Sequence, residues 1–193
     1  MRGSLNHPLS GYPRAVRAWR RSSSEVLFRH SLFELRRDRL EADGEARREA
    51  LVLEAPLWVN VVPRLADGRV VMVRQWRFGI GAPTLEIPGG MVEPGEEPAA
   101  AAARELLEET GYRAARISPL GEVEPNPAFL ANRCLTFLAT GLERVGEPEG
   151  DGEEELEVVL ERLEDLPARV AAGEIRHALV VAALYLHDLA GRP

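Results

Sequence analysis

The stretch Gly90–Tyr112 reads GMVEPGEEPAAAAARELLEETGY, and it carries the clearest helix signal in this chain of 193 residues. Pro98 stands where a helix tolerates proline, in its first turn, and five alanines follow it. Gly111 stands where a residue in the left-handed conformation ends a helix. Together these signals predict a helix over Pro98–Thr110.

Acidic residues recur on this helix at a spacing that suits a metal ion. Glu105, Glu108 and Glu109 stand at i, i+3 and i+4, which places their carboxylates on one side. Such crowding costs roughly a few tenths of a kcal/mol per pair in a bare helix. A hard divalent cation with oxygen ligands would turn that repulsion into binding. Another face of the helix is predicted to enter the core, with Ala103, Leu106 and Thr110.

The residues around the acidic cluster strengthen this interpretation. Gly89 and Gly90 let the backbone turn tightly just before the helix, so that a carbonyl oxygen can approach the same cation. Arg104 is expected to pair with Glu96 in the preceding loop or with Glu108 one turn further on. The alternative is an ordinary solvated face rich in Arg and Glu. The glycines, the glutamates and Arg104 together occupy more specific positions than chance would produce in an ordinary solvated helix, which favours the metal site.

The composition excludes several other kinds of chemistry. All 24 basic residues are arginine, so there is no lysine for a P-loop, a Schiff base or a pyridoxal anchor. Cys134 is the only cysteine, which rules out an intrachain disulfide and favours the reducing cytoplasm. A net charge of −7 disfavours binding to nucleic acid or anionic lipid and favours divalent cations. The longest apolar stretch, Ala178–Leu186, is too short to cross a membrane.

The region Gly90–Tyr112 resembles a complete Nudix box. The segments Val73–Arg77 (VRQWR) and Leu85–Gly90 (LEIPGG) make the surroundings similar to the ADP-ribose pyrophosphatase branch of that superfamily. The resemblance implies an α/β protein, an α/β/α sandwich with a mixed β-sheet, plus a small amino-terminal β-sheet. It also implies hydrolysis of a nucleoside diphosphate sugar with Mg²⁺ or Mn²⁺, with ADP-ribose giving AMP and ribose 5-phosphate.

The resemblance also implies roles for individual residues of the box. The metal ligands would be Glu105 and Glu109, with Glu108 as a shared ligand and the Gly89 carbonyl completing the shell. Arg104 belongs with Glu108 among the residues that catalysis requires, and it would orient the helix together with Glu96. Gly90 and Gly111 would be structural.

The proton acceptor is expected on a late acidic loop. Glu154 is the favoured residue and Glu153 the next, just before a predicted strand over residues 155–160. An acidic loop that merely keeps the protein in solution explains any single one of these glutamates about as well. The choice between the two interpretations stays open.

Substrate recognition is assigned to residues upstream and downstream of the box. Arg74 and Arg77 are candidates to bind the diphosphate, and Trp76 or Phe129 to stack on adenine. Plain packing explains each of them equally well, and the resemblance implies a role for Arg74 and for Glu86. The segment 124–129 lies where related enzymes carry a substrate loop. It has Asn-Pro-Ala where those enzymes often have Ser-Pro-Gly, which leaves room for other sugar nucleotides.

The chain divides into two predicted parts. Residues 1–55 form an arm and a small antiparallel sheet, which the resemblance makes a dimerisation region, and residues 56–193 form the Nudix hydrolase domain. In the first part, strands are expected over 26–40 and 46–53, with a turn at Asp43-Gly44. In the second, the expected strands are 58–65 and 69–76 as a hairpin, then 84–87 and 132–139, with helices over 163–172 and 178–189.

Two other functions remain as alternatives. One is a Nudix hydrolase with another substrate, such as a different nucleotide sugar, a dinucleoside polyphosphate or NADH. The other is a nucleotide-sugar sensor without catalysis, which usually combines a degraded box with a DNA-binding segment that this sequence does not offer. The expected partners are a small nucleotide and a second copy of the chain, with no nucleic acid or membrane. The four histidines show no metal-type spacing and are expected at the surface or in packing.

Overall fold

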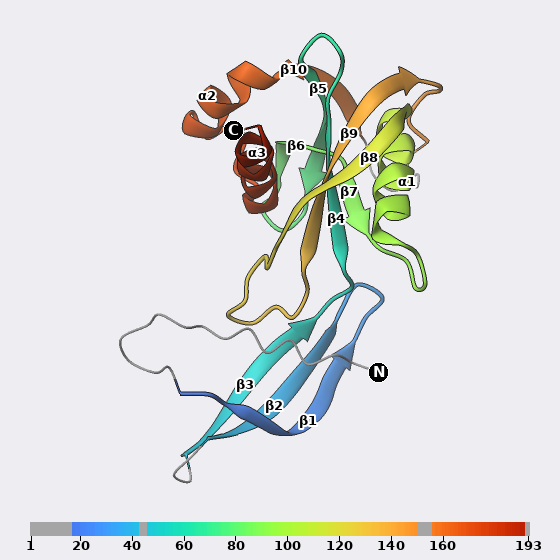
Figure 1. Ribbon diagram of the computed structural model, residues 1–193. Coiled ribbons are helices and arrows are strands. Elements are labelled where there is room, and N and C mark those ends of the chain that lie inside the picture. The colour runs from blue at the N-terminus through green and yellow to red at the C-terminus, as the bar shows by residue number, and fades with distance from the viewer. Residues whose placement is uncertain (1–16, 43–45, 150–155, 192–193) are drawn as a thin grey trace. The chain divides into compact units, whose positions relative to one another are not determined.

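The computed structural model describes residues 17–42, 46–149 and 156–191 (Figure 1). The chain separates into two compact units, one ending at Leu53 and the other beginning at Glu54. The two units are described one after the other.

The first unit is a three-stranded sheet in the order β1-β2-β3, formed by β1 (Arg20–Arg29), β2 (Glu34–Ala42) and β3 (Ala46–Glu54). The single strand expected over 26–40 is therefore wrong. The chain reverses between β1 and β2, where the N–H of His30 donates to the carbonyl of Phe33 at 2.9 Å. The rings of Phe28, His30 and Phe33 gather around this turn. The expected turn at Asp43-Gly44 lies outside the described residues.

The second unit contains two sheets. The first has the order β10-β5-β6 and is antiparallel, with β10 (Glu157–Arg162), β5 (Arg69–Arg77) and β6 (Ala82–Glu86). The second has the order β7-β4-β9-β8, with β7 (Gly89–Met91), β4 (Trp58–Pro63), β9 (Cys134–Arg144) and β8 (Tyr112–Val123). It is mixed, because β4 and β9 run parallel while its other pairs are antiparallel.

The hairpin expected from residues 58–65 and 69–76 is wrong. The turn forms, with the N–H of Gly68 donating to the carbonyl of Leu65 at 3.1 Å and the N–H of Leu65 donating to the carbonyl of Arg69 at 2.8 Å. Among the described residues, the pairing of the two segments goes no further than an isolated bridge between Arg64 and Val70. β4 and β5 then enter different sheets. Residues 59–63 of β4 and residues 70–73 of β5 are buried, whereas Arg74 and Trp76 further along β5 are exposed. A strand segment that is covered on both faces needs partner strands at its edges, and β4 and β5 find theirs in different sheets.

Two of the three predicted helices have the expected bounds to within one residue, and the third differs. α1 (Pro98–Thr110) has the expected bounds, and Gly111 ends it with φ of 71°. A Cβ at Gly111 would lie 2.2 Å from the carbonyl oxygen of Gly146, so this position requires glycine. α3 (Ala178–Ala190) extends the expected helix by one residue. The helix expected over 163–172 is instead a 3-10 turn, η1 (Leu163–Asp165), followed by α2 (Leu166–Ala171), and Pro167 lies at their junction.

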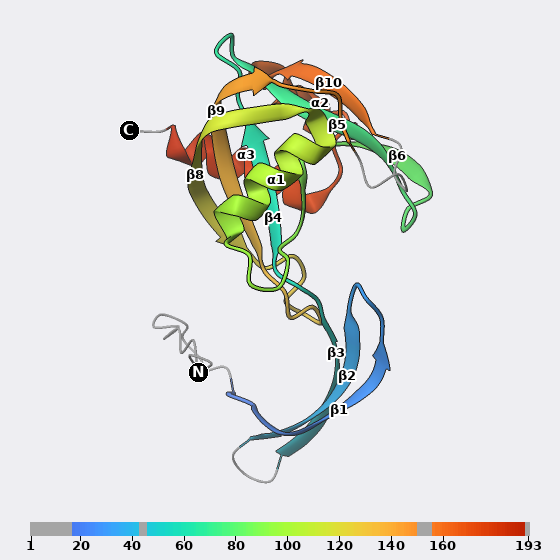
Figure 2. The same ribbon diagram turned by 90° about the vertical axis from the view of Figure 1, so that its right-hand side faces the viewer.

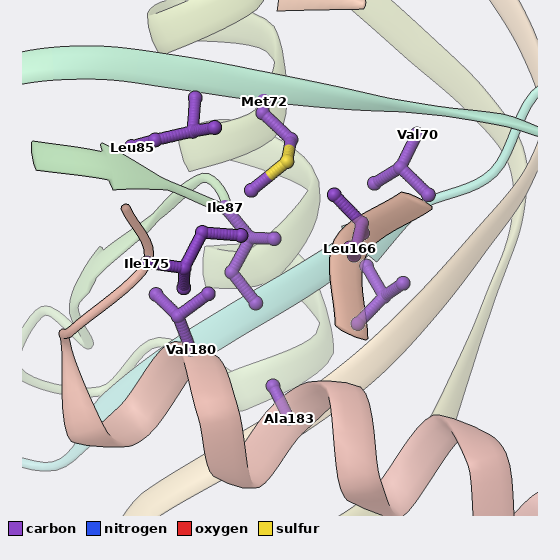
Figure 3. Packing of buried hydrophobic residues seen from close by; sticks show 9 residues of the cluster. Val70, Met72, Leu85, Ile87, Leu166, Ile175, Val180 and Ala183 are labelled. Atoms are coloured by element: carbon purple, nitrogen blue, oxygen red, sulfur yellow. The ribbon is translucent and has the colours of Figure 1, made fainter. Parts of the chain in front are cut away.

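Two buried clusters hold these layers together. One joins the sheets to α2 and α3, with Val62, Val70, Met72, Leu85, Ile87, Leu166, Ile175, Val180 and Ala183 (Figure 3). The other joins β4 and β9 to α1, with Val59, Val61, Ala101, Ala102, Leu106, Phe137 and Ala139. Figures 1 and 2 show α1 on one side of the strands and α3 on the other, which confirms the expected α/β/α arrangement.

One residue of α1 departs from the expected core face. Leu106 and Thr110 are fully buried, but Ala103 is exposed. The inward face of the helix instead carries Ala101 and Ala102. Among the described residues, no helix combines the length and the apolar character that a membrane crossing demands.

Candidate active site

Arg104 organises the carboxylates of α1. Its Nε and Nη2 donate to the two oxygens of Glu96 at 3.0 and 3.1 Å, and Nη2 also donates to the carbonyl of Met91 at 3.1 Å. Its Nη1 donates to Glu105 at 2.9 Å and to Glu108 at 3.0 Å. These hydrogen bonds, led by those with Glu96, raise the pKa of Arg104. The structure thus forms both of the pairings that the sequence offered as alternatives.

Glu109 joins the same helix to β7. Its Oε2 accepts a hydrogen bond from the N–H of Gly89 at 3.1 Å. The sequence had assigned the carbonyl of Gly89 to the site, and the observed contact uses the N–H of that residue instead. The contact fixes where α1 meets the glycine turn, and a ligand role for the carbonyl stays a prediction.

Glu105 lies deeper than its neighbours, with its side chain 14% exposed. Burial raises the pKa of its carboxyl, and the charges of Glu108 and Glu96 act in the same direction, while Arg104 opposes them. The charged form of Glu105 is thus less stable here than in water. A cation beside it would remove that penalty, so the position suits a metal ligand.

The three carboxylates of α1 do not form a ready-made cage. Within residues 17–42, 46–149 and 156–191, no three His, Cys, Asp or Glu side chains converge on a point that could hold a metal ion. Like charges repel, and here two of the carboxylates turn toward Arg104 while Glu109 binds the N–H of Gly89. The donor set still fits a hard divalent cation, since every candidate ligand is an oxygen, from the three carboxylates or from the carbonyl of Gly89. Glu153 and Glu154 lie outside the described residues.

A second polar cluster lies where β5 and β6 pair. Glu86 has a side chain that is 3% exposed and accepts two hydrogen bonds of 2.9 Å from Nε and Nη2 of Arg77. The hydroxyl of Thr84 donates to Oε1 of the same carboxylate at 2.5 Å. Burial alone would raise the pKa of Glu86, but these hydrogen bonds outweigh it and lower that pKa. Glu86 therefore stays charged at neutral pH and holds Arg77 in a fixed orientation.

The alternation of side chains along β5 separates the two arginines assigned to the diphosphate. Arg77 lies on one face of the strand, while Arg74 and Trp76 lie on the other. Arg74 pairs with Glu157 of β10 at 2.5 Å. Trp76 and Phe129 are both about half exposed, as a stacking partner for adenine needs to be. Their roles in binding stay predictions.

His177 is a neighbour of this cluster that the sequence did not assign. It stands just before α3, and its Nδ1 lies 3.7 Å from Oε2 of Glu86. The sequence had set His177 aside as a surface or packing residue. No local motif points to the contact, because 91 positions separate two residues that only the tertiary fold brings together.

We expect Gly90→Ala to lower activity while leaving the fold nearly intact. A Cβ at position 90 would lie 2.4 Å from Oε1 of Glu105, which must then turn away. The atom displaced is the end of a flexible side chain, so the loss of unfolding free energy should stay below about 1 kcal/mol. Moving a positioned group by about 1 Å can cost on the order of 100-fold in rate. The measurement is kcat/KM alongside the thermal midpoint.

Gly79→Ala is the matched control, because nothing lies within 4 Å of a Cβ built there. It should behave as the wild type in both measurements. Full activity in Gly90→Ala would show that the position of Glu105 does not matter for the reaction.

His177 should make the protein sensitive to mild acid. Burial lowers the pKa of His177 below its ordinary value of 6.5, and Arg77 adds to this effect while Glu86 opposes it. The folded protein therefore binds fewer protons than the unfolded chain, and the free energy of unfolding falls as the pH drops below 6.5. His177→Gln should reduce this fall. The test is the urea midpoint of both proteins at about pH 7 and about pH 5.

Comparing the loss of stability in His177→Gln with that in the wild type separates the contribution of His177 from that of other titratable groups. His187 also has a pKa lowered by burial, and it contributes equally to both proteins. Glu86 has a lowered pKa and loses its charge only below 4.5, outside this range. An equal loss of stability at about pH 5 in the wild type and in His177→Gln would show that His177 does not cause the acid sensitivity.

The layered fold and its acidic helix are those of the NUDIX domain, whose family model matches residues 56–184. The chain belongs to this family. It is 34% identical over 162 residues to the ADP-ribose pyrophosphatase of Mycobacterium tuberculosis, covering 83% of this chain and 78% of that protein. It is 31% identical over 163 residues to the ADP-ribose pyrophosphatase of Bacillus subtilis, covering 84% and 88%.

A solved structure shares the fold along nearly the whole chain. The crystal structure of an ADP compounds hydrolase superposes with a TM-score of 0.78 at 25% identity. The match covers 91% of this chain and 95% of the other. The expected relationship to the ADP-ribose pyrophosphatase branch is thereby confirmed.

Proposed function

We propose that this protein hydrolyses the diphosphate bond of a nucleoside diphosphate sugar, with ADP-ribose giving AMP and ribose 5-phosphate. The observation that carries the proposal is the set of glutamates on α1, which Arg104 and the N–H of Gly89 hold beside the glycine turn. The names of the two bacterial relatives support ADP-ribose as the substrate. The single cysteine is the sequence ground for placing the reaction in reducing cytoplasm.

We assign metal binding, positioning of the carboxylates and phosphate binding to different residues of the site. Glu105, Glu108 and Glu109 would hold Mg²⁺, which when bound neutralises charge on the diphosphate and makes a bound water more acidic. Arg104 fixes the positions of these carboxylates. Arg77 would bind phosphate oxygens, in the orientation that Glu86 sets.

Proton transfer needs a separate group. We assign the acceptor of the proton from the attacking water to Glu154, or next to Glu153. The assignment rests on their place in an acidic stretch of the sequence that precedes β10. A carboxylate acting as general base typically contributes about 10²–10⁴-fold to the rate.

We further propose that residues 1–55 mediate a homodimer. All ten residues of β1 are exposed, including Val26 and Phe28, and Leu51 of β3 is exposed as well. Exposed apolar side chains on such a small sheet favour a partner surface that covers them. Analytical ultracentrifugation of the full chain tests this directly, because a monomer at micromolar concentration would contradict the proposal.

A panel of substrates tests the reaction. The purified protein is incubated with Mg²⁺ and ADP-ribose, ADP-glucose, GDP-mannose, NADH, a diadenosine polyphosphate or coenzyme A, and the products are separated. We expect the highest kcat/KM with ADP-ribose, loss of turnover with chelator and recovery with Mg²⁺ or Mn²⁺. A protein that binds ADP-ribose without cleaving it would instead be a sensor.

A further inference from the structure

Gln75 on β5 contains a buried polar atom without a partner. Its side chain is buried, with 3% of the residue exposed, and its Oε1 accepts no hydrogen bond from the described residues. Leaving a buried acceptor unpaired is unfavourable, and such groups are rare in folded proteins. Gln75 therefore needs an explanation that packing alone does not give.

The neighbouring donors are already used by Glu86. Thr84 lies directly opposite Gln75 in the pairing of β5 with β6, and its hydroxyl donates to Oε1 of Glu86. Arg77 lies two residues further along the same face of β5, and its Nε and Nη2 also donate to Glu86. Gln75 thus adds an unpaired acceptor to the cluster of Arg77, Thr84 and Glu86.

This cluster borders the glycine turn of the site. Glu86 ends β6, and Gly89, whose N–H binds Glu109, comes three residues later. Three extended residues span about 10 Å at most, which is a distance that a nucleoside diphosphate sugar easily bridges. β6 is an edge strand of its sheet, and Arg77 is partly exposed, so the cluster can be approached from solvent.

The geometry points to Gln75 as a substrate-binding residue whose side-chain oxygen accepts a hydrogen bond from a hydroxyl group of the substrate's sugar. Phosphate oxygens only accept hydrogen bonds, so they do not satisfy Oε1, whereas sugar hydroxyls donate. Arg77 beside it supplies the cation for a phosphate. Because Oε1 is covered in the free protein, the carboxamide turns outward as the sugar binds. This inference rests on the proposed hydrolysis of nucleoside diphosphate sugars.

A purely structural role makes different predictions. If a buried water satisfied Gln75, replacing the residue would destabilise the fold and leave the choice of substrate unchanged. If the substrate satisfies it, an apolar side chain of similar length is tolerated or favoured in the free protein. Stability and specificity therefore separate the two roles.

The test uses Gln75→Met in the full chain, which keeps the length of the side chain and removes the acceptor. We expect an unchanged or higher urea midpoint and a drop of about 10-fold in kcat/KM for ADP-ribose, the effect of losing one neutral hydrogen bond. The matched control is Met72→Leu, a conservative change on the opposite face of the same strand. It should keep the selectivity of the wild type.

Analogues of ADP-ribose that lack one ribose hydroxyl at a time complete the test. The wild type should lose about 10-fold on the analogue that lacks the recognised hydroxyl. Gln75→Met should show no further loss on that analogue. Wild-type kcat/KM and selectivity in Gln75→Met, or a lower urea midpoint with unchanged selectivity, would overturn the inference. Absence of any hydrolysis by the wild type would instead contradict the proposed function.

Discussion

Replacing Glu109 with glutamine is expected to lower kcat/KM by on the order of 10³-fold, with little change in stability. The side-chain oxygen of glutamine can still accept the hydrogen bond from Gly89, now observed at 3.1 Å, so the contact between α1 and β7 is kept. What is lost is one negative charge at the proposed metal site. Steady-state kinetics at saturating Mg²⁺ and the thermal midpoint measure the two effects separately.

Glu97→Gln is the matched control for this variant. Glu97 is an exposed carboxylate at the N-terminal end of the same helix, with no side-chain hydrogen bond that caps it. Its replacement removes the same charge and should leave kcat/KM unchanged. Equal turnover in Glu109→Gln and the wild type would remove Glu109 from the reaction.

Arg104→Met is expected to impair both stability and activity. The guanidinium donates to three carboxylates and a carbonyl, and only about a quarter of the side chain is exposed. Without it, Glu96, Glu105 and Glu108 are left as mutually repelling charges. We expect a loss of about 2–4 kcal/mol in the free energy of unfolding and a fall of more than about 100-fold in kcat/KM.

The metal dependence of this variant gives a sharper result. If the carboxylates are metal ligands, saturating Mg²⁺ replaces the missing positive charge and recovers part of the stability that is lost in chelator. Urea denaturation in both conditions measures this. Arg116→Met serves as the control, because Arg116 is exposed and its one hydrogen bond to another described side chain goes to Ser118. Stability equal to wild type in chelator would show that Arg104 does not organise the site.

The part of the fold that the sequence predicts well depends on local signals. α1 was predicted with correct bounds because Pro98 and Gly111 act within one turn of the helix ends. β8 was not predicted, since Arg113, Arg116 and Pro119 break the apolar pattern of a strand. β8 is nevertheless a strand, because it pairs with β9 along its length, with a shift in register between Pro119 and Gly121.

In the candidate site, too, local spacing is predictable from the sequence and tertiary contacts are not. The spacing of Glu105, Glu108 and Glu109 is local, and the structure places all three on α1 as expected. Their contacts with Arg104 and Gly89 depend on tertiary geometry, which the local spacing does not give. Gln75 lies in the segment VRQWR that carries the resemblance, but nothing in the sequence assigns it a role. What distinguishes it is that its Oε1 has no hydrogen-bond partner among the described residues.

The separation of Arg74 from Arg77 shows how register changes a functional interpretation. In the sequence they are three residues apart and equally basic. In a strand, two residues separated by an odd number of positions have side chains on opposite faces. Arg74 and Arg77 therefore do not approach one diphosphate from the same face of β5. Arg77 is fixed by Glu86, while Arg74 pairs with Glu157. We therefore propose Arg77, rather than Arg74, as the residue that binds the phosphates.

The most direct test of the account is whether the glutamates of α1 hold divalent ions. Binding of Mn²⁺ can be followed by electron paramagnetic resonance in the presence of a non-hydrolysable analogue of ADP-ribose, for the wild type, Glu105→Gln, Glu109→Gln and the control Glu97→Gln. We predict tight binding in the wild type and the control, and a loss of at least about tenfold in affinity in the other two variants. Equal Mn²⁺ affinity in all four proteins would contradict the central claim.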